Sequence, residues 1–255
     1  MCTISWNLPH TVYVSQDEGV SWQPSDSGLV WVWEGNDSSL YKALPRKFKG
    51  VGDKVYAVTT SYGGIYVTGD FGKTWNVFQQ YYATGFFNLY IHPVNTQIMW
   101  VETTGPYGGS SIGKSSDGGV TWQGLPESFT SRYQFVDDIA LHPTYPDIVY
   151  VGAEGNVYKT EDFGDIWVQV LSGDSLDIST SLITINDNQP NHLVVYGSNN
   201  TIFRSIQESW DGGISWREID YPYELHIYFR PIFDPINEAL YFPTEGGVLK
   251  YDSSE

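Results

Sequence analysis

The chain has 255 residues, of which 41% are hydrophobic and 16% aromatic, so it is long enough to bury the core of one β domain. Its formal net charge of −17, from 30 acidic against 13 basic side chains, favours solubility and argues against nucleic acid or an anionic lipid surface as a partner. The single cysteine, Cys2, excludes an internal disulfide and a cysteine-rich metal site.

The N-terminal residues lack the basic and apolar regions of a secretory signal peptide. No apolar run approaches membrane-spanning length. We therefore expect neither export nor membrane insertion, which leaves the cytoplasm or a virion as the setting.

A pattern of the form Ser/Thr-x-Asp-x-Gly-x-x-Trp recurs at residues 68–75, 115–122, 160–167 and 209–216. The hydroxyl and the carboxylate accept backbone N–H bonds in a tight turn, and the glycine supplies a positive φ. The tryptophan buries a large flat surface between neighbouring sheets. The structural residues predicted from the pattern are Asp70, Gly72, Trp75, Asp117, Gly119, Trp122, Asp162, Gly164, Trp167, Asp211, Gly213 and Trp216.

The pattern resembles the Asp-box, or BNR, repeat, in which this turn joins the third and fourth strands of a β-propeller blade. The resemblance implies an all-β fold of four-stranded antiparallel blades, and no specific member of the superfamily is matched. Proteins with such repeats include sialidases, xyloglucan hydrolases, sorting receptors and assembly factors without catalysis. The resemblance therefore predicts the fold and leaves the function open.

Alternating apolar and β-branched residues, bounded by Gly, Pro, Asn and Asp, predict the strands of each blade. The third blade has strands at 88–92, 97–103 and 111–115 and one from 120; the fourth has strands at 138–142, 147–152, 156–160 and 166–170. The fifth has strands near 182 and at 193–197, 201–205 and 214–218; the last has strands at 228–234, 239–242 and 247–252.

Residues 15–22 also match the turn pattern, but the alignment of Leu8-Pro9-His10 with Leu44-Pro45-Arg46 argues that this match is a decoy. On that alignment the first blade has strands at 11–15, 20–24, 29–34 and 40–44. Asp37 then becomes a degenerate turn aspartate, and Tyr41 corresponds to Trp75.

The two ends of the chain predict a closed ring. The last blade lacks a fourth strand, and Thr3-Ile4-Ser5-Trp6 reads as a fourth strand without its blade. Pairing the N-terminal strand with the three C-terminal strands removes free sheet edges. We therefore predict one six-bladed propeller domain over residues 1–255. Its blades lie near 8–45, 46–80, 81–125, 126–171, 172–219 and 220–255, the last completed by 1–7.

Two motifs resemble ligand-binding or catalytic sites, but the repeat explains them better. Residues 108–115 satisfy the phosphate-binding pattern G-x-x-x-x-G-K-S, but they lead into a turn and a strand instead of a helix. His92 and His142 share one repeat position before a proline, which favours a role in the corner over that of a base or ligand.

The propeller face opposite the Asp-box turns usually holds the binding site, and its loops here are rich in aromatic residues. Aromatic rings beside polar groups suit sugars, although half or more of these rings would simply pack the loops onto the blades. The candidate ligand-binding residues are Tyr62, Tyr81, Tyr82, Phe86, Tyr107, Tyr133, Asp138, Tyr221, Tyr223 and Arg230.

One position at the start of each blade's first strand also stands out; it is filled by Lys47, Asn88, Asp138, Leu182 and Arg230. Asp138 and Arg230 would form a structural ion pair, or Arg230 would bind a carboxylate. Acidic residues cluster at Asp137/Asp138 and at Asp174/Asp177. These carboxylates suit Ca²⁺ or acid–base chemistry on a glycosidic bond, and a solvated acidic loop is the simpler interpretation. No cofactor is expected, and Ca²⁺ is left open.

These observations favour a non-catalytic binding or scaffold propeller that recognises a glycan or a partner protein, as an assembly factor or a virion component. The chain has five arginines and no Arg-Ile-Pro, so it lacks what resemblance to a sialidase would require. One ring of this length also cannot form the two-propeller cleft of the xyloglucan hydrolases. The alternative is a glycoside hydrolase that uses carboxylates among Asp137, Asp138, Asp174, Asp177 and Glu224. Catalytic residues are not assigned, and the oligomeric state, monomer or part of a larger assembly, is left open.

Overall fold

The structure of the protein is a computed structural model, and it describes thirteen segments of the chain. These are residues 2–4, 12–32, 40–43, 45–59, 64–79, 86–104, 110–126, 129, 135–173, 178–199, 202–220, 230–244 and 246–251. The chain divides into two compact units: unit 1 is Met1–Ile91 with Thr96–Gly124, and unit 2 is His92–Asn95 with Leu125–Glu255. Whether the whole chain is one domain stays a prediction.

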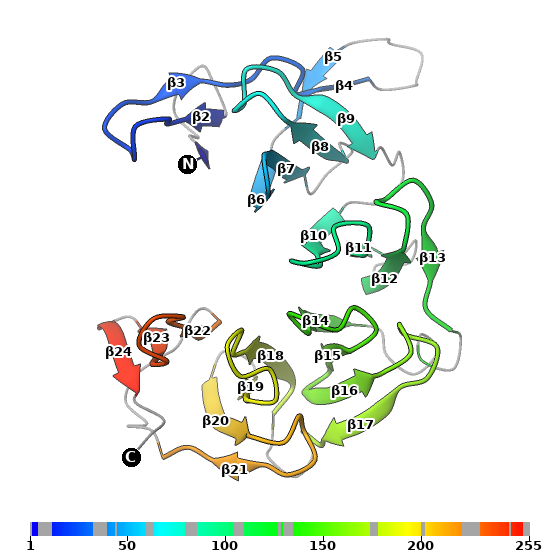
Figure 1. The fold of residues 1–255 in the computed structure, drawn as a ribbon, viewed down its shortest axis with the longest axis vertical. Helices are drawn as coiled ribbons and strands as arrows, with labels where there is room; N and C mark the ends of the chain where they lie inside the picture. Colours follow the sequence, from blue (N-terminus) through cyan, green and yellow to red (C-terminus); the bar gives the residue numbers. More distant parts are fainter. Residues whose placement is uncertain are drawn as a thin grey trace. The chain divides into compact units, whose positions relative to one another are not determined.

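Unit 1 is built from antiparallel sheets (Figure 1). A three-stranded sheet has the order β1-β2-β3, and β4 pairs with β5 in a hairpin. Two four-stranded sheets follow, β6-β7-β8-β9 and β10-β11-β12-β13. The strands are β1 (Cys2–Ile4), β2 (Val12–Val14), β3 (Gln23–Pro24), β4 (Val30–Val32), β5 (Leu40–Lys42), β6 (Pro45–Val51), β7 (Lys54–Thr59), β8 (Ile65–Thr68), β9 (Asn76–Gln79), β10 (Phe86–Ile91), β11 (Met99–Thr104), β12 (Ser110–Ser115) and β13 (Gln123–Gly124).

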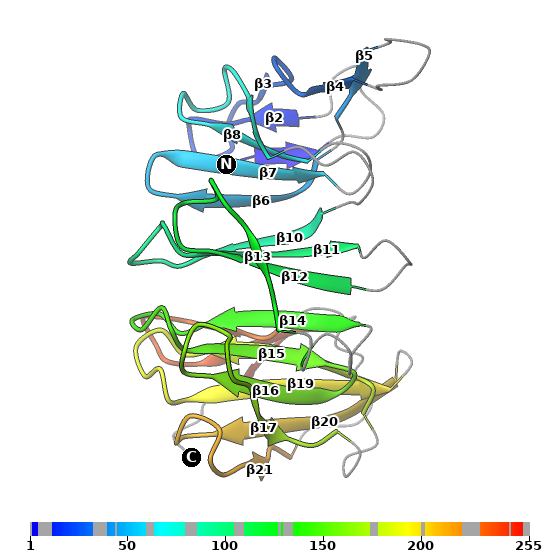
Figure 2. The ribbon, with the colours of Figure 1, turned by 90° about the vertical axis from the view of Figure 1, so that its right-hand side faces the viewer.

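Unit 2 continues the same architecture with the sheets β14-β15-β16-β17 and β18-β19-β20-β21 and a three-stranded sheet β22-β23-β24. Figure 2 shows how neighbouring strands of β14–β17 run in opposite directions. The strands are β14 (Val136–Leu141), β15 (Val149–Ala153), β16 (Asn156–Thr160), β17 (Val168–Leu171), β18 (Thr180–Ile185), β19 (Leu193–Asn199), β20 (Ile202–Ser209), β21 (Arg217–Glu218), β22 (Ile232–Phe233), β23 (Leu240–Thr244) and β24 (Gly247–Tyr251).

The prediction of four-stranded antiparallel blades is confirmed, but the prediction of six blades is wrong. Within the described segments, five sheets have their strands side by side in chain order, as in a propeller blade. These sheets begin with β6, β10, β14, β18 and β22. The fifth of these blades has three described strands. The predicted first blade is replaced by the β1–β3 sheet and the β4–β5 hairpin.

The register predicted for the first quarter is also wrong. Residues 15–22 are not a decoy, because they connect β2 to β3 with the same hydrogen bonds as the other four turns. The N-terminal strand β1 pairs with β2 through Thr3 and Tyr13, so it belongs to this sheet and is not shown to complete the last blade. Tyr41 pairs with Trp31 in the hairpin, while Trp6 and Asp37 lie outside the described residues.

The five turns share one hydrogen-bond scheme, seen at residues 115–122. The hydroxyl of Ser115 donates to Asp117 Oδ1 over 2.8 Å and accepts the N–H of Gly119 over 2.9 Å. Asp117 Oδ1 accepts the N–H of Thr121, also over 2.9 Å. The matching hydrogen bonds are present in the turns that begin at Ser15, Thr68, Thr160 and Ser209. Each turn is therefore closed by its own polar side chains.

Two consecutive residues in each turn adopt the left-handed conformation. The fifth position is always glycine, with φ between 81° and 93°. At Gly119 a Cβ would also lie 2.4 Å from the ring of Phe78 in β9, so both the backbone and the packing require glycine. The fourth position is glycine in two turns, but it is Glu18, Phe71 or Phe163 in the others, each with φ 59°. A side chain in this conformation costs roughly 1–2 kcal/mol.

The core lies between adjacent sheets of each unit. In unit 1, Val58 and Ile65 of one blade pack with Leu89 and Val101 of the next. In unit 2, one buried cluster joins β14–β17 to β18–β21, and another joins β18–β21 to β22–β24. Strands that alternate buried and exposed positions thus stack face to face, which leaves the strand ends and loops for polar chemistry.

Candidate functional site

In three blades, a β-bulge near the start of the first strand positions a polar side chain. A shift in strand register immediately precedes Lys47 in β6, Asn88 in β10 and Asp138 in β14. Bulges redirect side chains and are frequent beside functional sites. Leu182, predicted for the same position, pairs with Tyr196 in a regular ladder. In three described blades, the first strand therefore begins with a bulge followed by a polar residue.

In unit 1 the bulge residues of adjacent blades contact each other. The ammonium of Lys47 donates to Asn88 Oδ1, and Asn88 Nδ2 donates to Glu102 Oε2 over 2.6 Å. Glu102 lies on β11 and is only 7% exposed. This chain of polar contacts links β6, β10 and β11.

In unit 2 the predicted pair of Asp138 and Arg230 is present. The guanidinium of Arg230 donates to Asp138 Oδ1, and the second carboxylate oxygen accepts the N–H of Ile183 over 2.9 Å. Burial raises the pKa of the Asp138 carboxyl, while the charge of Arg230 and the backbone N–H groups oppose that rise. Asp138 is 2% exposed but the side chain of Arg230 is 41% exposed. The ion pair therefore joins the blades and keeps part of the guanidinium at the surface.

The neighbouring carboxylate of Asp137 is also held by backbone. Its Oδ2 accepts the N–H of Ser181 over 3.0 Å and that of Gly155 over 3.3 Å. Burial raises the pKa of the Asp137 carboxyl to about 6, although the two backbone N–H groups lower it. The acidic pair at 137 and 138 thus fastens β14 to β18 instead of forming a solvated loop.

The other predicted ligand residues are not brought together by what the structure describes. Phe86 lies in β10, paired with Thr103. The remaining candidates lie outside the described residues: Tyr62, Tyr81, Tyr82, Tyr107, Tyr133, Tyr221, Tyr223, Asp174, Asp177 and Glu224. Their proposed roles stay predictions.

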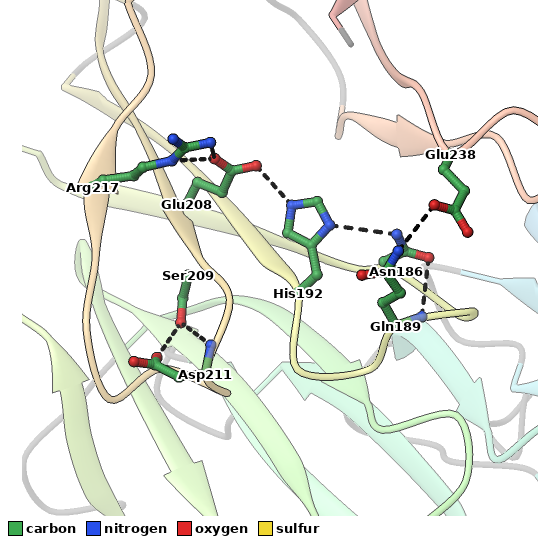
Figure 3. A network of polar contacts seen from close by, with 8 residues as sticks. All are labelled: Asn186, Gln189, His192, Glu208, Ser209, Asp211, Arg217 and Glu238. Atoms are coloured by element: carbon green, nitrogen blue, oxygen red, sulfur yellow. Dashed lines mark hydrogen bonds and ion pairs between the residues drawn. The ribbon is translucent and has the colours of Figure 1, made fainter. Parts of the chain in front are cut away.

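A buried polar network in unit 2 escaped the sequence analysis (Figure 3). Glu208 Oε1 lies 2.7 Å from His192 Nε2, and Arg217 Nε donates to Glu208 Oε2 over 2.7 Å. Burial raises the pKa of the Glu208 carboxyl, but its bonds to His192 and Arg217 outweigh burial and lower it below its ordinary value. His192 also stacks on Trp210 at 3.6 Å between ring centroids. The network connects β20 and β21 to the turn between β18 and β19.

One half of this network had a sequence signal. Glu208 and Arg217 flank the turn at 209–216 and face each other across the β20–β21 ladder. Opposite charges directly before and after such a turn predict a cross-strand pair. His192 had no comparable signal, because it reaches Glu208 from the turn before β19 and the contact depends on the register of the β19–β20 pair.

The corner role predicted for His92 and His142 is confirmed. His92 Nδ1 accepts the N–H of Asn95 over 3.0 Å, and His142 Nδ1 accepts that of Tyr145 over the same distance. Likewise, Lys114 of the rejected phosphate motif lies in strand β12.

Within the segments that the structure describes, no group of three or more His, Cys, Asp or Glu side chains is arranged to hold a metal ion. The Ca²⁺ question stays open for the acidic residues outside those segments. No helix among the described residues is long and apolar enough to cross a membrane.

No protein-family model matches the chain, and no curated protein matches its sequence. Solved structures do match it. The GH74 enzyme from Niastella koreensis is 17% identical with a TM-score of 0.64, over 83% of this chain and 36% of that one. An ancestral GH74 enzyme is 15% identical with a TM-score of 0.67, over 95% of this chain and 34% of that one. A structure of YCF48 bound to D1 peptide is 18% identical with a TM-score of 0.67, over 96% of this chain and 72% of that one.

These similarities define the class of fold, an all-β propeller built from four-stranded antiparallel blades. The chain spans about a third of the length of the GH74 structures it matches. Proteins with this fold include glycoside hydrolases and a propeller seen with a peptide, so the fold alone does not select between catalysis and binding.

Proposed function

We propose that this chain is a non-catalytic binding propeller that recognises a partner protein or a glycan. The observation that carries the proposal is the set of hydrogen bonds made by Asp137 and Asp138. Both carboxylates accept backbone N–H groups of the adjacent blade, and Asp138 also holds Arg230. Carboxylates committed in this way hold the blades together and are poorly placed to attack or protonate a substrate.

The partially exposed guanidinium of Arg230 supports a contact with the partner. Asp138 fixes the side chain from one side, and its 41% exposure leaves donors for a carboxylate of a peptide or an acidic sugar. The YCF48 structure with D1 peptide supports a protein partner by analogy of fold. The aromatic loop residues named above would complete the contact, in a cytoplasmic or virion setting.

A combined array tests this proposal. The full chain is applied to immobilised glycans, polysaccharides and peptides, and both retention and the release of reducing ends are measured. We expect retention without release, and weaker retention for Arg230→Gln than for Arg230→Lys. Failure of every surface to retain the chain, or equal retention of both variants on the acidic glycans and peptides, would contradict the role given to Arg230.

The alternative, a glycoside hydrolase, is favoured by one observation. The raised pKa of Asp137, about 6, is of the kind found in general acids. If that alternative holds, reducing ends appear in the array, and Asp137→Asn abolishes their release while binding is retained.

A further inference from the structure

Two hollows in unit 1 lie beside Phe71. One, of about 360 Å³, lies between the turn at 15–22 and the turn at 68–75 and is lined by Gln16, Gln23 and Lys73 among others. The second, of about 620 Å³, is lined by Ser15, Gln16, Glu18 and Phe71. Phe71 and Gln16 belong to both. Each volume falls within the roughly 300–1,000 Å³ of small-molecule sites.

Phe71 occupies a position where stability alone would favour glycine. It has φ 59°, and two other turns have glycine at the same position, Gly118 and Gly212. Phe71 is 66% exposed, so burial of its ring offsets little of the free-energy cost of the strained backbone. Non-glycine residues in this conformation are concentrated at functional sites, but Glu18 and Phe163 adopt the same conformation in two other turns. Phe71 differs from Phe163 in its exposed ring, which lines both hollows and is therefore available to a ligand.

The polar groups around the ring define the chemistry of that ligand. Gln16 and Gln23 line the first hollow, and a glutamine amide has both donors and an acceptor, which suits neighbouring hydroxyls. The charge of Lys73 is opposed by that of Asp17 in the same hollow, and Glu18 lines the other. These charges disfavour an anion. An aromatic face with amides around it and no net positive charge matches the apolar C–H face and the hydroxyls of a neutral sugar ring.

We propose that the hollows beside Phe71 form a subsite for a neutral pyranose ring of a glycan, with Phe71 as the stacking platform and Gln16 and Gln23 as hydroxyl-binding groups. The turn hydrogen bonds hold the platform in place, since Asp70 accepts the N–H of Thr74 and Thr68 accepts that of Gly72. The subsite involves neither Asp138 nor Arg230, and it does not rest on the binding role given to them.

Saturation-transfer NMR of the full chain with maltohexaose, cellohexaose and chitohexaose at millimolar concentration tests the subsite. We expect at least one of the three to receive saturation, most strongly at ring C–H protons. Phe71→Gly should weaken that binding at least about tenfold, which corresponds to 1.4 kcal/mol. Because Phe71→Gly relieves the strained backbone, it should not lower the melting temperature, so lost binding would not reflect unfolding.

Three controls make the outcome decisive. Phe163→Gly changes the equivalent residue of the turn at 160–167, with the same φ of 59°, and should leave the binding unchanged. Phe71→Tyr should keep it, because the ring remains. Arg230→Gln should also keep it, which separates this subsite from the proposed function. Absence of saturation for all three sugars, or equal binding by wild type and Phe71→Gly, would overturn the proposal.

Discussion

At the scale of single residues, Asp137 and Asp138 show how neighbours on one strand acquire different roles. A β-bulge interrupts regular alternation between Val136 and Asp138, and both carboxylates accept backbone N–H groups of β18. Asp138 binds the N–H of Ile183 and Arg230, whereas Asp137 binds Gly155 and Ser181. Asp137 has no cationic partner among these bonds, which makes its charge costly to bury.

We expect Asp137 to make stability depend on pH between about 4 and 6. Its pKa rises from 3.8 to about 6 on folding, so its stabilising contribution is complete below pH 3.8 and is lost as the pH rises through about 6. The variant Asp137→Asn lacks this titration. Its free energy of unfolding relative to wild type should increase by up to about 3 kcal/mol between pH 4 and pH 7.

Urea unfolding at several pH values measures this difference. Asp53→Asn, the same chemical change at the exposed turn between β6 and β7, is measured beside it as a surface reference. A constant difference between Asp137→Asn and wild type over this pH range would contradict the raised pKa of the half-buried Asp137 carboxyl.

At the scale of structural elements, the turns are the repeated unit of construction. Ser115 is 2% exposed, and its hydroxyl is the acceptor for the buried N–H of Gly119. Ser115→Ala should therefore cost about 1–3 kcal/mol, because a buried donor loses its partner. Ser116→Ala, at the next and exposed position, should change stability by less than about 0.5 kcal/mol. Thermal or urea unfolding of both variants measures the contrast, and equal losses would show that the turn hydroxyl is dispensable.

The network at Glu208 predicts a larger loss. Arg217→Met removes one of the two partners of a carboxylate whose side chain is fully buried. We expect a loss of about 3 kcal/mol from the uncompensated charge, and a smaller loss for Arg217→Lys, which keeps the charge. Chemical denaturation compares the two variants with wild type. A loss below about 1 kcal/mol for Arg217→Met would mean that water or His192 compensates Glu208 without the arginine.

The sequence predicted best the elements whose structure depends on residues close by in the chain. The strand predicted at 156–160 has the same first and last residues in the structure, because its apolar residues alternate and turn residues flank it. The turn at 15–22 was misjudged because an alignment of Leu-Pro pairs was preferred to the local hydrogen-bonding pattern. The hollows beside Phe71 were missed because they depend on the turns at 15–22 and 68–75 meeting in space, although an aromatic residue at a glycine-favouring turn position was a usable signal.

At the scale of the whole molecule, the charge of −17 should make stability depend on salt. Folding brings like charges together, and their repulsion reaches about 30 Å at 0.01 M salt but only about 10 Å at 0.1 M. We expect the melting temperature at pH 7 to rise as NaCl increases over this range. Near the sequence pI of 4.4, where the net charge vanishes, the same series should give little change. A melting temperature that falls with NaCl at pH 7 would mean that local ion pairs outweigh the repulsion.

The order of strands within each blade has a kinetic consequence. In the four complete blades, every hydrogen-bonded pair joins strands that are consecutive in the chain. Contacts between near neighbours in sequence close short loops, and proteins rich in them fold quickly. During synthesis, each blade can pair its own strands while later blades are still on the ribosome. The newly made chain then exposes apolar blade faces more than unpaired strands, until the next blade emerges to cover them.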